Sequence, residues 1–379
     1  MPSIKTHRHG VCNRLQTGWF TTRNESTLFF RVSEEIKKLD RKTPNIQDVA
    51  RLAGVSTATV SRAISNPSIV TEATREAVFD AIRRTGYQIN LTARNLRRRR
   101  TGAIVVLVPN IGNPFFSQIL AGIEQAAAPA GFSVLIVDTT QPHAADEQVF
   151  AYLHNTRADG LIVLDGSLRP CLLDRLDSAE AIPPVVFACE WIPGSSFSRV
   201  MIDNPAGAAL AIRHLHELGH RRVGHIKGPS GNVLTETRLE GTRSAMSELG
   251  LEAVPEWFFQ GDFSLRSGAE AARRWLALNE RPSAMFCASD QMACGFISEL
   301  SLAGVSVPHD VSVVGFDDLD IGQHFIPALT TVRPPRIQIG ATAAELLMER
   351  INNGANAHAR VDRTLDVELI IRQSTAPVS

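Results

Sequence analysis

Between residues 56 and 66 the chain places short polar side chains beside one arginine, a combination suited to the edges of DNA bases. Short side chains let a helix approach the floor of the major groove, where an arginine can donate two hydrogen bonds to guanine. Thr57 and Arg62 are therefore the expected base-reading residues, and the Ala58 methyl suits a thymine methyl. The alternative is that Arg62 is an ordinary surface charge. The DNA contacts predicted on this segment are Ser56, Thr57, Ala58, Thr59, Ser61, Arg62 and Asn66.

Two short helices around a tight turn are predicted to hold these side chains. Asn45 can cap the first helix, with Asp48 completing a capping box three residues later. A glycine supplies the turn, and Ser56 can cap the second helix, whose apolar side chains lie on one face. A third helix is expected between Thr71 and Gly86, with arginines in the last turn that suit the helix dipole. This pattern is typical of a helix-turn-helix.

From residue 103 onward, apolar runs alternate with helical patterns. Runs such as AIVVLV, SVLIVD and GLIVL are typical of buried parallel strands. The alternation repeats in the second half, which predicts two doubly wound parallel-sheet subdomains of the α/β class. We expect the chain to cross between them near Pro205–Leu218, Asp290 and Leu329–Pro335. A cleft at the carboxyl ends of the strands is where such folds bind ligands.

Charge is divided unevenly along the chain. Residues 1–101 contain 19 Lys and Arg against 8 Asp and Glu, whereas residues 102–379 contain 20 against 31. A basic first part suits DNA phosphates, although a solvated basic tail would give the same count. No run of about 18 apolar residues is present, so we expect no membrane partner, and the basic start lacks the apolar core of a secretory signal. The 5 scattered cysteines form no CxxC pair, which favours reduced thiols and a cytoplasmic location.

Several motifs, in this order and spacing, resemble the LacI/GalR family of bacterial transcriptional regulators over residues 44–379. They include VSTATVSRAISNP, ARNLRRRRT, NPFFSQILAGIEQAA, ASDQMACG, VSVVGFDD and PALTTVRPP. Within the family, STATVSR, PFFS, GDF and the closing ELIIR are most similar to the cytidine-responsive repressor branch. The resemblance implies a three-helix DNA-binding head followed by two lobes like those of periplasmic sugar-binding proteins.

The resemblance also implies a division into parts. Residues 1–43 form a basic tail, 44–90 the helix-turn-helix head, 91–101 a hinge helix, and 102–379 an effector-binding and dimerisation domain. In LacI-like proteins the hinge folds beside DNA and inserts a leucine into the minor groove, which assigns Leu96 to that role and Arg97 to the DNA backbone. An ordinary basic linker is the alternative. The tail is an addition to the family pattern, and we expect it to be disordered or to reflect an upstream start codon.

A ligand site at the strand ends is a further implication of the resemblance. Phenylalanines there suit stacking on a flat ring, Arg238 is expected before a helix as a ligand clamp, and carboxylates suit hydroxyls or ring nitrogens. The alternative is that the phenylalanines are core residues and the aspartates cap helices. The effector-binding residues predicted are Phe115, Phe116, Arg238, Phe263, Ser289, Asp290 and Asp317.

One departure from the family pattern leaves the ligand class open between a nucleoside and a sugar. Many relatives have an Asp-Arg pair where this chain has Cys189-Glu190-Trp191. Asn232 and Thr235 are further possible contacts.

His216 to His220 reads HELGH, a literal match to the HExxH zinc motif. Two histidines four apart must share one helix face to hold zinc. Gly219 is expected to end the helix and break that face, so we expect no metal site. No GxGxxG, GxxxxGK[ST] or GxSxG motif suggests a cofactor or an enzyme.

The sequence therefore predicts a sequence-specific transcription regulator, most simply a repressor, that is not an enzyme and needs no cofactor. Its expected partners are a palindromic DNA operator, a second copy in a homodimer and a small-molecule effector in the cleft. The alternatives are a solute-binding receptor without a transcriptional role and, more remotely, a zinc hydrolase.

Overall fold

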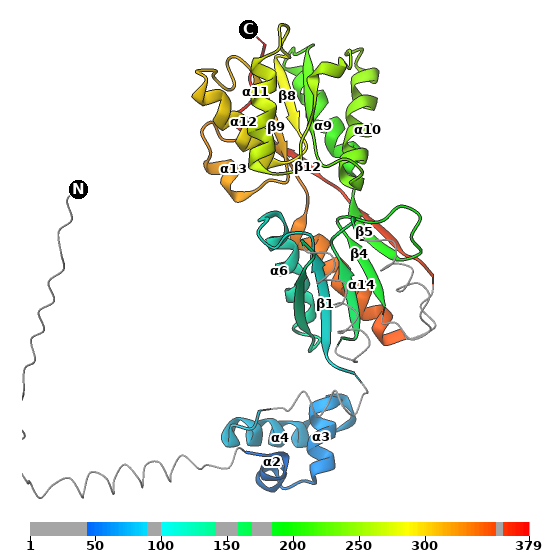
Figure 1. The fold of residues 1–379 in the computed structure, drawn as a ribbon. Helices are drawn as coiled ribbons and strands as arrows, with labels where there is room; N and C mark the ends of the chain where they lie inside the picture. The colour runs from blue at the N-terminus through cyan, green and yellow to red at the C-terminus, as the bar shows by residue number, and fades with distance from the viewer. Residues whose placement is uncertain (1–43, 89–99, 141–157, 169–183, 354–358, 379) are drawn as a thin grey trace, which may run out of the picture. The chain divides into compact units, whose positions relative to one another are not determined.

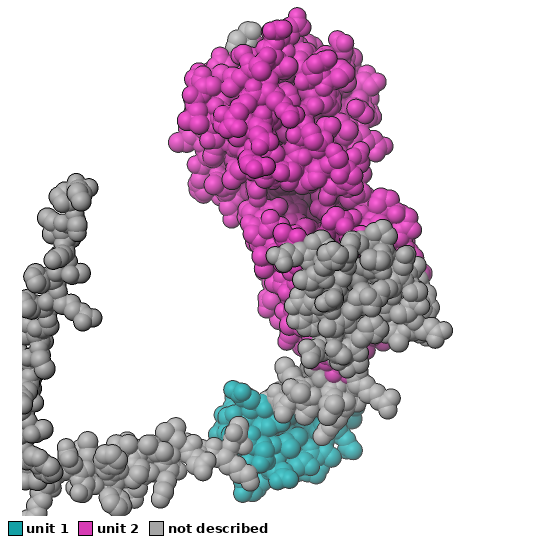
Figure 2. Space-filling model, viewed as in Figure 1, with its two compact units in different colours: residues 1–90 teal, residues 91–379 magenta. Residues whose placement is uncertain are grey.

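A computed structural model of the chain describes residues 44–88, 100–140, 158–168, 184–353 and 359–378 (Figure 1). Contacts divide the chain into two compact units, residues 1–90 and residues 91–379 (Figure 2). The expected basic tail, residues 1–43, lies outside the described residues, as do Leu96 and Arg97 of the expected hinge. No helix within the described ranges is both long and apolar enough to cross a membrane.

Unit 1 is built from short capped helices. They are α2 (Ile46–Ala53), α3 (Thr57–Ser65), the 3₁₀ turn η1 (Pro67–Ile69) and α4 (Glu72–Thr85). Asn45 Oδ1 accepts the N–H of Gln47 at 2.8 Å, and the Asn45 N–H donates to Asp48 at 3.1 Å, which confirms the predicted capping box. Gly54 and Gly86 end α2 and α4 in the left-handed conformation, at φ 67° and 68°. Local chemistry therefore sets where these helices begin and end.

The helices of unit 1 share one small apolar core. Its fully buried members come from all three α-helices and are Val49, Ala50, Val60, Ala63, Val78 and Ala81. Side chains such as Ile46, Val55 and Ile64 complete the core from its edges. Because α3 turns only Val60 and Ala63 fully inward, much of its surface faces solvent.

Unit 2 contains two sheets, each with helices packed on it, which we call lobe 1 and lobe 2 (Figure 1). The sheet of lobe 1 has the order β11-β5-β4-β3-β1-β2, and all its pairings are parallel. Its strands are β1 (Ala103–Val108), β2 (Ser133–Asp138), β3 (Gly160–Val163), β4 (Val185–Ala188), β5 (Ser198–Ile202) and β11 (Asp362–Leu365). Helices α6 (Phe115–Ala127) and α14 (Arg336–Asn353) pack together in this lobe.

Lobe 2 repeats the plan with the order β12-β10-β9-β8-β6-β7. Its strands are β6 (Val223–Lys227), β7 (Phe258–Gln260), β8 (Ala284–Cys287), β9 (Ser312–Phe316), β10 (Thr330–Arg333) and β12 (Glu368–Ile370). Its helices are α9 (Asn204–Glu217), α10 (Val233–Glu248), η2 (Pro255–Trp257), α11 (Leu265–Leu276), α12 (Asp290–Leu302) and α13 (Asp320–His324). Side chains of β8 alternate, with Phe286 facing α9 and α10 and Met285 facing α11 and α12. The prediction of two parallel-sheet subdomains is confirmed, except that β12 pairs antiparallel to β10.

The chain passes between the lobes three times within the described part of unit 2. It leaves β5 for α9 at Asp203, leaves β10 for α14 at Pro334 and Pro335, and leaves β11 for β12 at Asp366 and Val367. The second of these was predicted, the first lies just before the predicted range Pro205–Leu218, and the third was not predicted. The predicted crossing at Asp290 is wrong, because Asp290 opens α12 and the preceding strand β8 lies in the same lobe.

Glycines let paired helices in each lobe approach closely. A Cβ atom on Gly122 of α6 would lie 2.0 Å from the carbonyl oxygen of Ile337 in α14, and one on Gly340 would lie 2.0 Å from that of Ile119. In lobe 2, Gly268 of α11 and Gly295 of α12 meet the backbone of the opposite helix in the same way. These helix pairs therefore pack backbone to backbone, with no space for a larger residue.

Candidate functional site

The exposed face of α3 carries the residues predicted to contact DNA. Ser56 caps the helix, since its Oγ accepts the Thr59 N–H at 3.1 Å and lies 2.9 Å from the Thr59 hydroxyl. Of the predicted DNA contacts, Ser56, Thr57, Ala58, Arg62 and Asn66 are exposed to solvent, whereas Thr59 and Ser61 are half-buried. The short side chains thus stand on one surface with Arg62 beside them, which is an arrangement that can enter a groove.

Asn66 marks the end of this surface. Its backbone N–H donates to the carbonyl of Arg62 at 2.8 Å, and Pro67 then starts the 3₁₀ turn. The structure brings together all the predicted DNA contacts on this segment.

A cavity of about 420 Å³ opens between the two lobes of unit 2. It is lined from lobe 1 by residues after β1, β3 and β4, and from lobe 2 by residues after β6 and β7 and by Gln291 of α12. The cavity therefore sits where the carboxyl ends of strands from both sheets meet, as expected for open α/β sheets. Its lining includes Asn110, Asn113, Phe116, Asp165, Ser167, Glu190, Ser230, Asn232, Asp262, Phe263, Ser264 and Gln291.

Two aromatic rings line this cavity from opposite lobes. Phe116 projects from the first turn of α6 and is 5 % exposed. Phe263 follows β7 with a left-handed backbone at φ 67°, an unfavourable conformation for a bulky residue. A Cβ atom on Gly228 would lie 2.2 Å from the Phe263 ring, so the glycine makes room for that ring. A ligand between the lobes can contact both side chains.

Phe115 lies behind Phe116 and is not part of the cavity lining. The two rings meet edge to face with centroids 5.2 Å apart, and Phe115 also faces the Arg336 guanidinium at 6.0 Å. Phe115 therefore supports the ring of Phe116.

Arg238 is fully enclosed in lobe 2 and does not line this cavity. It was expected before a helix, but α10 begins at Val233, so Arg238 lies within the helix and this expectation is wrong. Its Nε donates to Asn204 Oδ1 at 2.9 Å, its NH1 donates to the Ala288 carbonyl, and its guanidinium lies 3.6 Å above the Phe316 ring. Burial lowers the pKa of Arg238.

Asp317 forms a buried ion pair with Arg238, with 3.7 Å between Oδ1 and NH1. Burial raises the pKa of Asp317 to about 7, although the guanidinium groups of Arg238 and Arg336 act in the opposite direction. The backbone of Asp317 is strained, at φ 117°. Asp317 is 7 % exposed and is not a lining residue of the cavity.

Ser289 and Asp290 form hydrogen bonds within lobe 2. Ser289 caps α12 by accepting the Met292 N–H at 3.3 Å. Asp290 is completely buried and accepts from the Leu319 N–H at 2.7 Å and the Thr331 hydroxyl at 2.6 Å. Both residues thus complete the structure of lobe 2, and neither lines the cavity.

Several lining residues escaped the sequence prediction. Asp165 follows the apolar strand GLIVL, so the rule that singled out Asp317 could have found it. Its Oδ1 accepts from the Ser167 N–H at 2.8 Å, and its Oδ2 accepts from the Thr139 hydroxyl. Asp262 precedes Phe263 and gave no separate signal.

Glu190 and Asn232 meet across the cavity. Glu190 Oε2 accepts from Asn232 Nδ2 at 3.0 Å, while Asn232 also caps α10. Burial raises the pKa of Glu190 to about 7, and neighbouring Asp165 adds to that rise. A second contact between the lobes joins Gln291 Nε2 to Asn113 Oδ1 at 3.0 Å. The lobes therefore touch through side chains that line the site.

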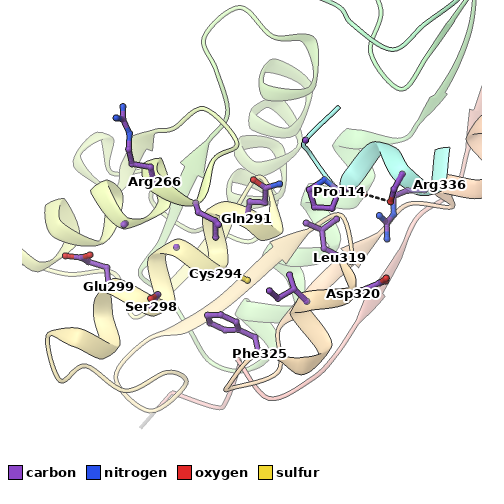
Figure 3. Close-up of a pocket in the computed structure, with 16 residues that line it drawn as sticks. Pro114, Arg266, Gln291, Cys294, Ser298, Glu299, Leu319, Asp320, Phe325 and Arg336 are labelled. Atoms are coloured by element: carbon purple, nitrogen blue, oxygen red, sulfur yellow. Dashed lines mark hydrogen bonds between the residues drawn. The ribbon is translucent and has the colours of Figure 1, made fainter. Parts of the chain in front are cut away.

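A second hollow of about 720 Å³ lies beside α11, α12 and α13 (Figure 3). Cys294 and Ser298 of α12 and Leu319 and Phe325 around α13 point into it, and Pro114 and Arg336 border it from lobe 1 (Figure 3). We call this hollow the α12 groove. Two of its apolar side chains, Leu265 and Ile321, are 56 % and 58 % exposed.

The HELGH segment does not form a zinc motif. Helix α9 ends at Glu217, and Gly219 turns the chain at φ 89°, which confirms the predicted break. His220 points into lobe 2, where its ring contacts Ser283 at 2.9 Å and Ser312 at 3.0 Å. Among the residues that the structure describes, no group of His, Cys, Asp and Glu could hold a metal ion.

Comparisons with known proteins agree across both units. Residues 45–90 match the family of bacterial regulatory proteins named lacI, and residues 212–375 match a periplasmic binding protein-like domain. The HTH-type transcriptional repressor CytR of Escherichia coli K12 is 38 % identical over 338 residues, covering 89 % of this chain and 98 % of that protein.

Solved structures extend these similarities. The transcriptional regulator CelR in complex with cellobiose is 34 % identical, with a TM-score of 0.66 over 87 % of this chain and 99 % of that one. The lac repressor dimer bound to operator and the anti-inducer ONPF is 28 % identical, with a TM-score of 0.71 over 88 % and 100 %.

Proposed function

Since this chain belongs to the LacI family of bacterial regulatory proteins, we propose here which of its residues read DNA and which bind its effector. The protein is a DNA-binding transcription regulator controlled by a small molecule, and it is not an enzyme. Neither a solute receptor without a transcriptional role nor a zinc hydrolase is favoured.

The head, residues 44–90, binds a palindromic operator through α3. Thr57 and Arg62 read base edges, Ala58 contacts a thymine methyl, and Ser56, Thr59, Ser61 and Asn66 contact bases or phosphates nearby. The exposure of this face of α3 supports the assignment. Residues 91–101 act as a hinge in which Leu96 enters the minor groove and Arg97 contacts the backbone.

The effector of residues 102–379 is a nucleoside or a sugar bound in the interlobe cavity. The observation that carries this proposal is the pair Phe116 and Phe263, which offer aromatic faces from opposite lobes beside polar strand ends. A volume of about 420 Å³ suits such a molecule. Phe115 acts through its contact with Phe116, and Ser289, Asp290, Arg238 and Asp317 act indirectly by holding the structure of lobe 2.

Effector binding changes the angle between lobes that touch through Glu190 and Asn232 and through Gln291 and Asn113. A ligand that prefers one lobe angle shifts the population of that state. Because the operator prefers paired hinges, the same shift changes DNA affinity, which couples the two sites.

A second copy of the chain covers the α12 groove in a homodimer. The groove exposes apolar Leu265 and Ile321 beside Phe325, and large exposed apolar patches mark protein interfaces. A two-fold dimer presents two heads to a two-fold operator. A regulator of this kind works where the chromosome is, so we place the protein in the cytoplasm.

A thermal-shift titration of the purified chain against nucleosides, purines, pentoses and hexoses tests the effector class. A ligand at 100 times its Kd adds about 2.7 kcal/mol of stability. Phe263→Leu is expected to abolish the shift, whereas Phe258→Leu, which alters a ring on β7 outside the cavity lining, is expected to keep it. Equal shifts in both variants would contradict the stacking role of Phe263.

A further inference from the structure

Arg100, the last of four consecutive arginines in the predicted hinge segment, is bonded to lobe 1. Its NH1 donates to Asn352 Oδ1 at 2.7 Å, and its NH2 donates to the Ile351 carbonyl at 2.7 Å. Both acceptors lie at the C-terminal end of α14. The carbonyls of a last helical turn lack partners within the helix and carry partial negative charge, so a cation there is favourable. Arg100 therefore caps α14 from a distant part of the chain.

The two residues after Arg100 are also held by hydrogen bonds. Asp159 Oδ1 accepts the Thr101 N–H at 2.8 Å, and Asp159 Oδ2 accepts the Gly102 N–H at 2.7 Å. Gly102 has a left-handed backbone at φ 72°, which glycine adopts without strain, and the chain then enters β1. Asp159 directly precedes β3, the neighbour of β1 in the sheet. Residues 100–102 are thus fixed to lobe 1 before the sheet begins.

Helix α14 is a rigid support for Arg100. It packs on β3, β4 and β5 as well as on α6, with which it shares the close backbone contacts at Gly122 and Gly340. A Cβ atom on Gly160 of β3 would lie 2.9 Å from the Leu347 side chain of α14, so this contact has no spare space either. A tightly packed helix keeps its place in the lobe. A residue bonded to its end therefore takes its orientation from lobe 1.

This attachment distinguishes Arg100 from an arginine that binds phosphate. Attraction to phosphates requires charge and sets the affinity for any DNA, whereas binding to a two-fold site requires two heads held over its half-sites. Fixing one end of the hinge in the free protein reduces the conformational freedom that is lost on binding. Because both terminal nitrogens of Arg100 are engaged by α14, Arg100 is suited to this second role.

We propose that Arg100 is a positioning residue for operator binding: by capping α14 it fixes where the hinge leaves lobe 1, and it acts without contacting DNA. The proposal rests on the hinge role of residues 91–101 given above. It separates Arg100 from Arg97 of the same arginine run, for which a contact with the DNA backbone is proposed. Asn352 is a second positioning residue, because its side-chain oxygen orients the guanidinium.

Fluorescence anisotropy of the full-length protein on two labelled duplexes tests the proposal. One duplex carries a palindromic site that the wild-type protein selects from a random library, and the other is a scrambled sequence of the same length. Arg100→Ala is expected to weaken binding to the selected site about tenfold and binding to the scrambled duplex less than about twofold.

The salt dependence of binding separates positioning from phosphate contact. In Arg100→Ala the slope of log K against log salt concentration should equal that of the wild type. In Arg97→Ala the slope should fall in magnitude by about 1.8, because each copy in the homodimer loses one phosphate contact.

The partner of Arg100 provides an independent variant. Asn352→Ala keeps the arginine charge and removes one acceptor, so it should weaken binding to the selected site about threefold. The double variant should bind no more weakly than Arg100→Ala, because both residues act through one contact. Asn353→Ala, at the exposed next position of α14, is the matched control and should bind like the wild type. Thermal melting followed by circular dichroism checks that each variant is folded at the assay temperature.

Each outcome supports or overturns the proposal. A slope in Arg100→Ala that falls as in Arg97→Ala would make Arg100 a phosphate contact. Additive effects of Arg100→Ala and Asn352→Ala would show that Arg100 does not act through α14. If Arg100→Ala unfolds, wild-type binding by Asn352→Ala would overturn the proposal. A wild-type protein that selects no palindromic site would contradict the operator proposal itself, whereas a selected site bound equally well by Arg100→Ala would remove the positioning role alone.

Discussion

The recognition surface of α3 and the interlobe cavity are built in opposite ways. The surface on α3 consists of neighbours in sequence that a single capped helix presents to solvent. The cavity gathers loops after five different strands, and one of its lining residues, Phe263, has a strained backbone. A site on one exposed helix can change its side chains with little effect on stability, whereas a site at buried strand ends cannot.

The difference follows from where the charges are. Arg62 is exposed to water, so its removal leaves no unpaired partner. Arg238, Asp317 and Glu190 are enclosed, and their charged forms depend on one another. We therefore expect cavity mutations to change both folding and ligand binding, and mutations of exposed α3 side chains such as Arg62 to change DNA binding alone.

The largest expected effect comes from Arg238→Ala. At pH 8 this change leaves the buried Asp317 carboxylate without its partner, and breaking a buried pair costs about 3–5 kcal/mol. Urea unfolding of the full-length protein, monitored by circular dichroism, measures the loss of stability in unit 2. Arg243→Ala, at an exposed position on the same helix, should cost less than about 0.5 kcal/mol. An equal loss in both variants would contradict the claim that the enclosed arginine matters more for stability than the exposed one.

The pH dependence of stability is the next largest effect. Burial raises the pKa of Glu190 from 4.5 to about 7, so the folded protein holds this proton more tightly than the unfolded chain. Wild-type stability relative to Glu190→Gln should therefore fall by roughly 3 kcal/mol as the pH rises from 4.5 through 7. Urea midpoints at pH 5, 6, 7 and 8 measure this difference. A difference that stays constant over this range would mean that Glu190 is as well solvated as a surface residue.

Arg62→Ala tests the exposed surface of α3, where we expect a loss of operator affinity without a loss of stability. We expect operator affinity to fall by about 1–3 kcal/mol with little change for unrelated DNA, because a base contact is lost. Fluorescence anisotropy with both DNAs measures the two affinities, and the unfolding free energy should stay within about 0.5 kcal/mol of wild type. Arg84→Ala on α4, paired with Asp80, serves as the control. Equal losses on both DNAs would make Arg62 a phosphate contact.

The smallest effect is expected from Asn45→Ala. Loss of the capping box should destabilise unit 1 by about 1 kcal/mol while leaving unit 2 unchanged. Hydrogen exchange of the α2 amides, followed by mass spectrometry on the whole protein, measures the loss. Ser65→Ala, at the exposed end of α3, is the matched change without a cap and should leave exchange rates near wild type.

The architecture of unit 1 could be predicted because its signals are local. A cap needs only the residues three positions away, so Asn45, Ser56 and Thr71 were enough to place the starts of three helices. The alternating strands and helices of unit 2 were predictable for a similar reason, since apolar runs and periodicity appear within short windows.

The cavity was harder to predict because burial depends on distant segments. Asp290 looks like a free carboxylate after a strand, but it accepts hydrogen bonds from Leu319, just before α13, and from Thr331 in β10, which lie 29 and 41 residues further along the chain. The expectation that Arg238 precedes its helix overlooks Asn232, which caps α10 six residues earlier. Glu190 was noticed only as a departure from the family pattern, and its contact with Asn232 depends on how the lobes meet.

The backbone contacts at Gly122, Gly340, Gly268 and Gly295 have a consequence for engineering new effector responses. Any side chain at these positions would force two helices apart, so neither helix pair accepts a residue larger than glycine there. Exposed lining residues on the loops that follow the strands, such as Asn110 and Ser230, are not packed between helices in this way. A library aimed at a different inducer should therefore randomise such exposed positions and leave the buried lining residues and the four glycines unchanged, since substitutions at the glycines would yield misfolded proteins.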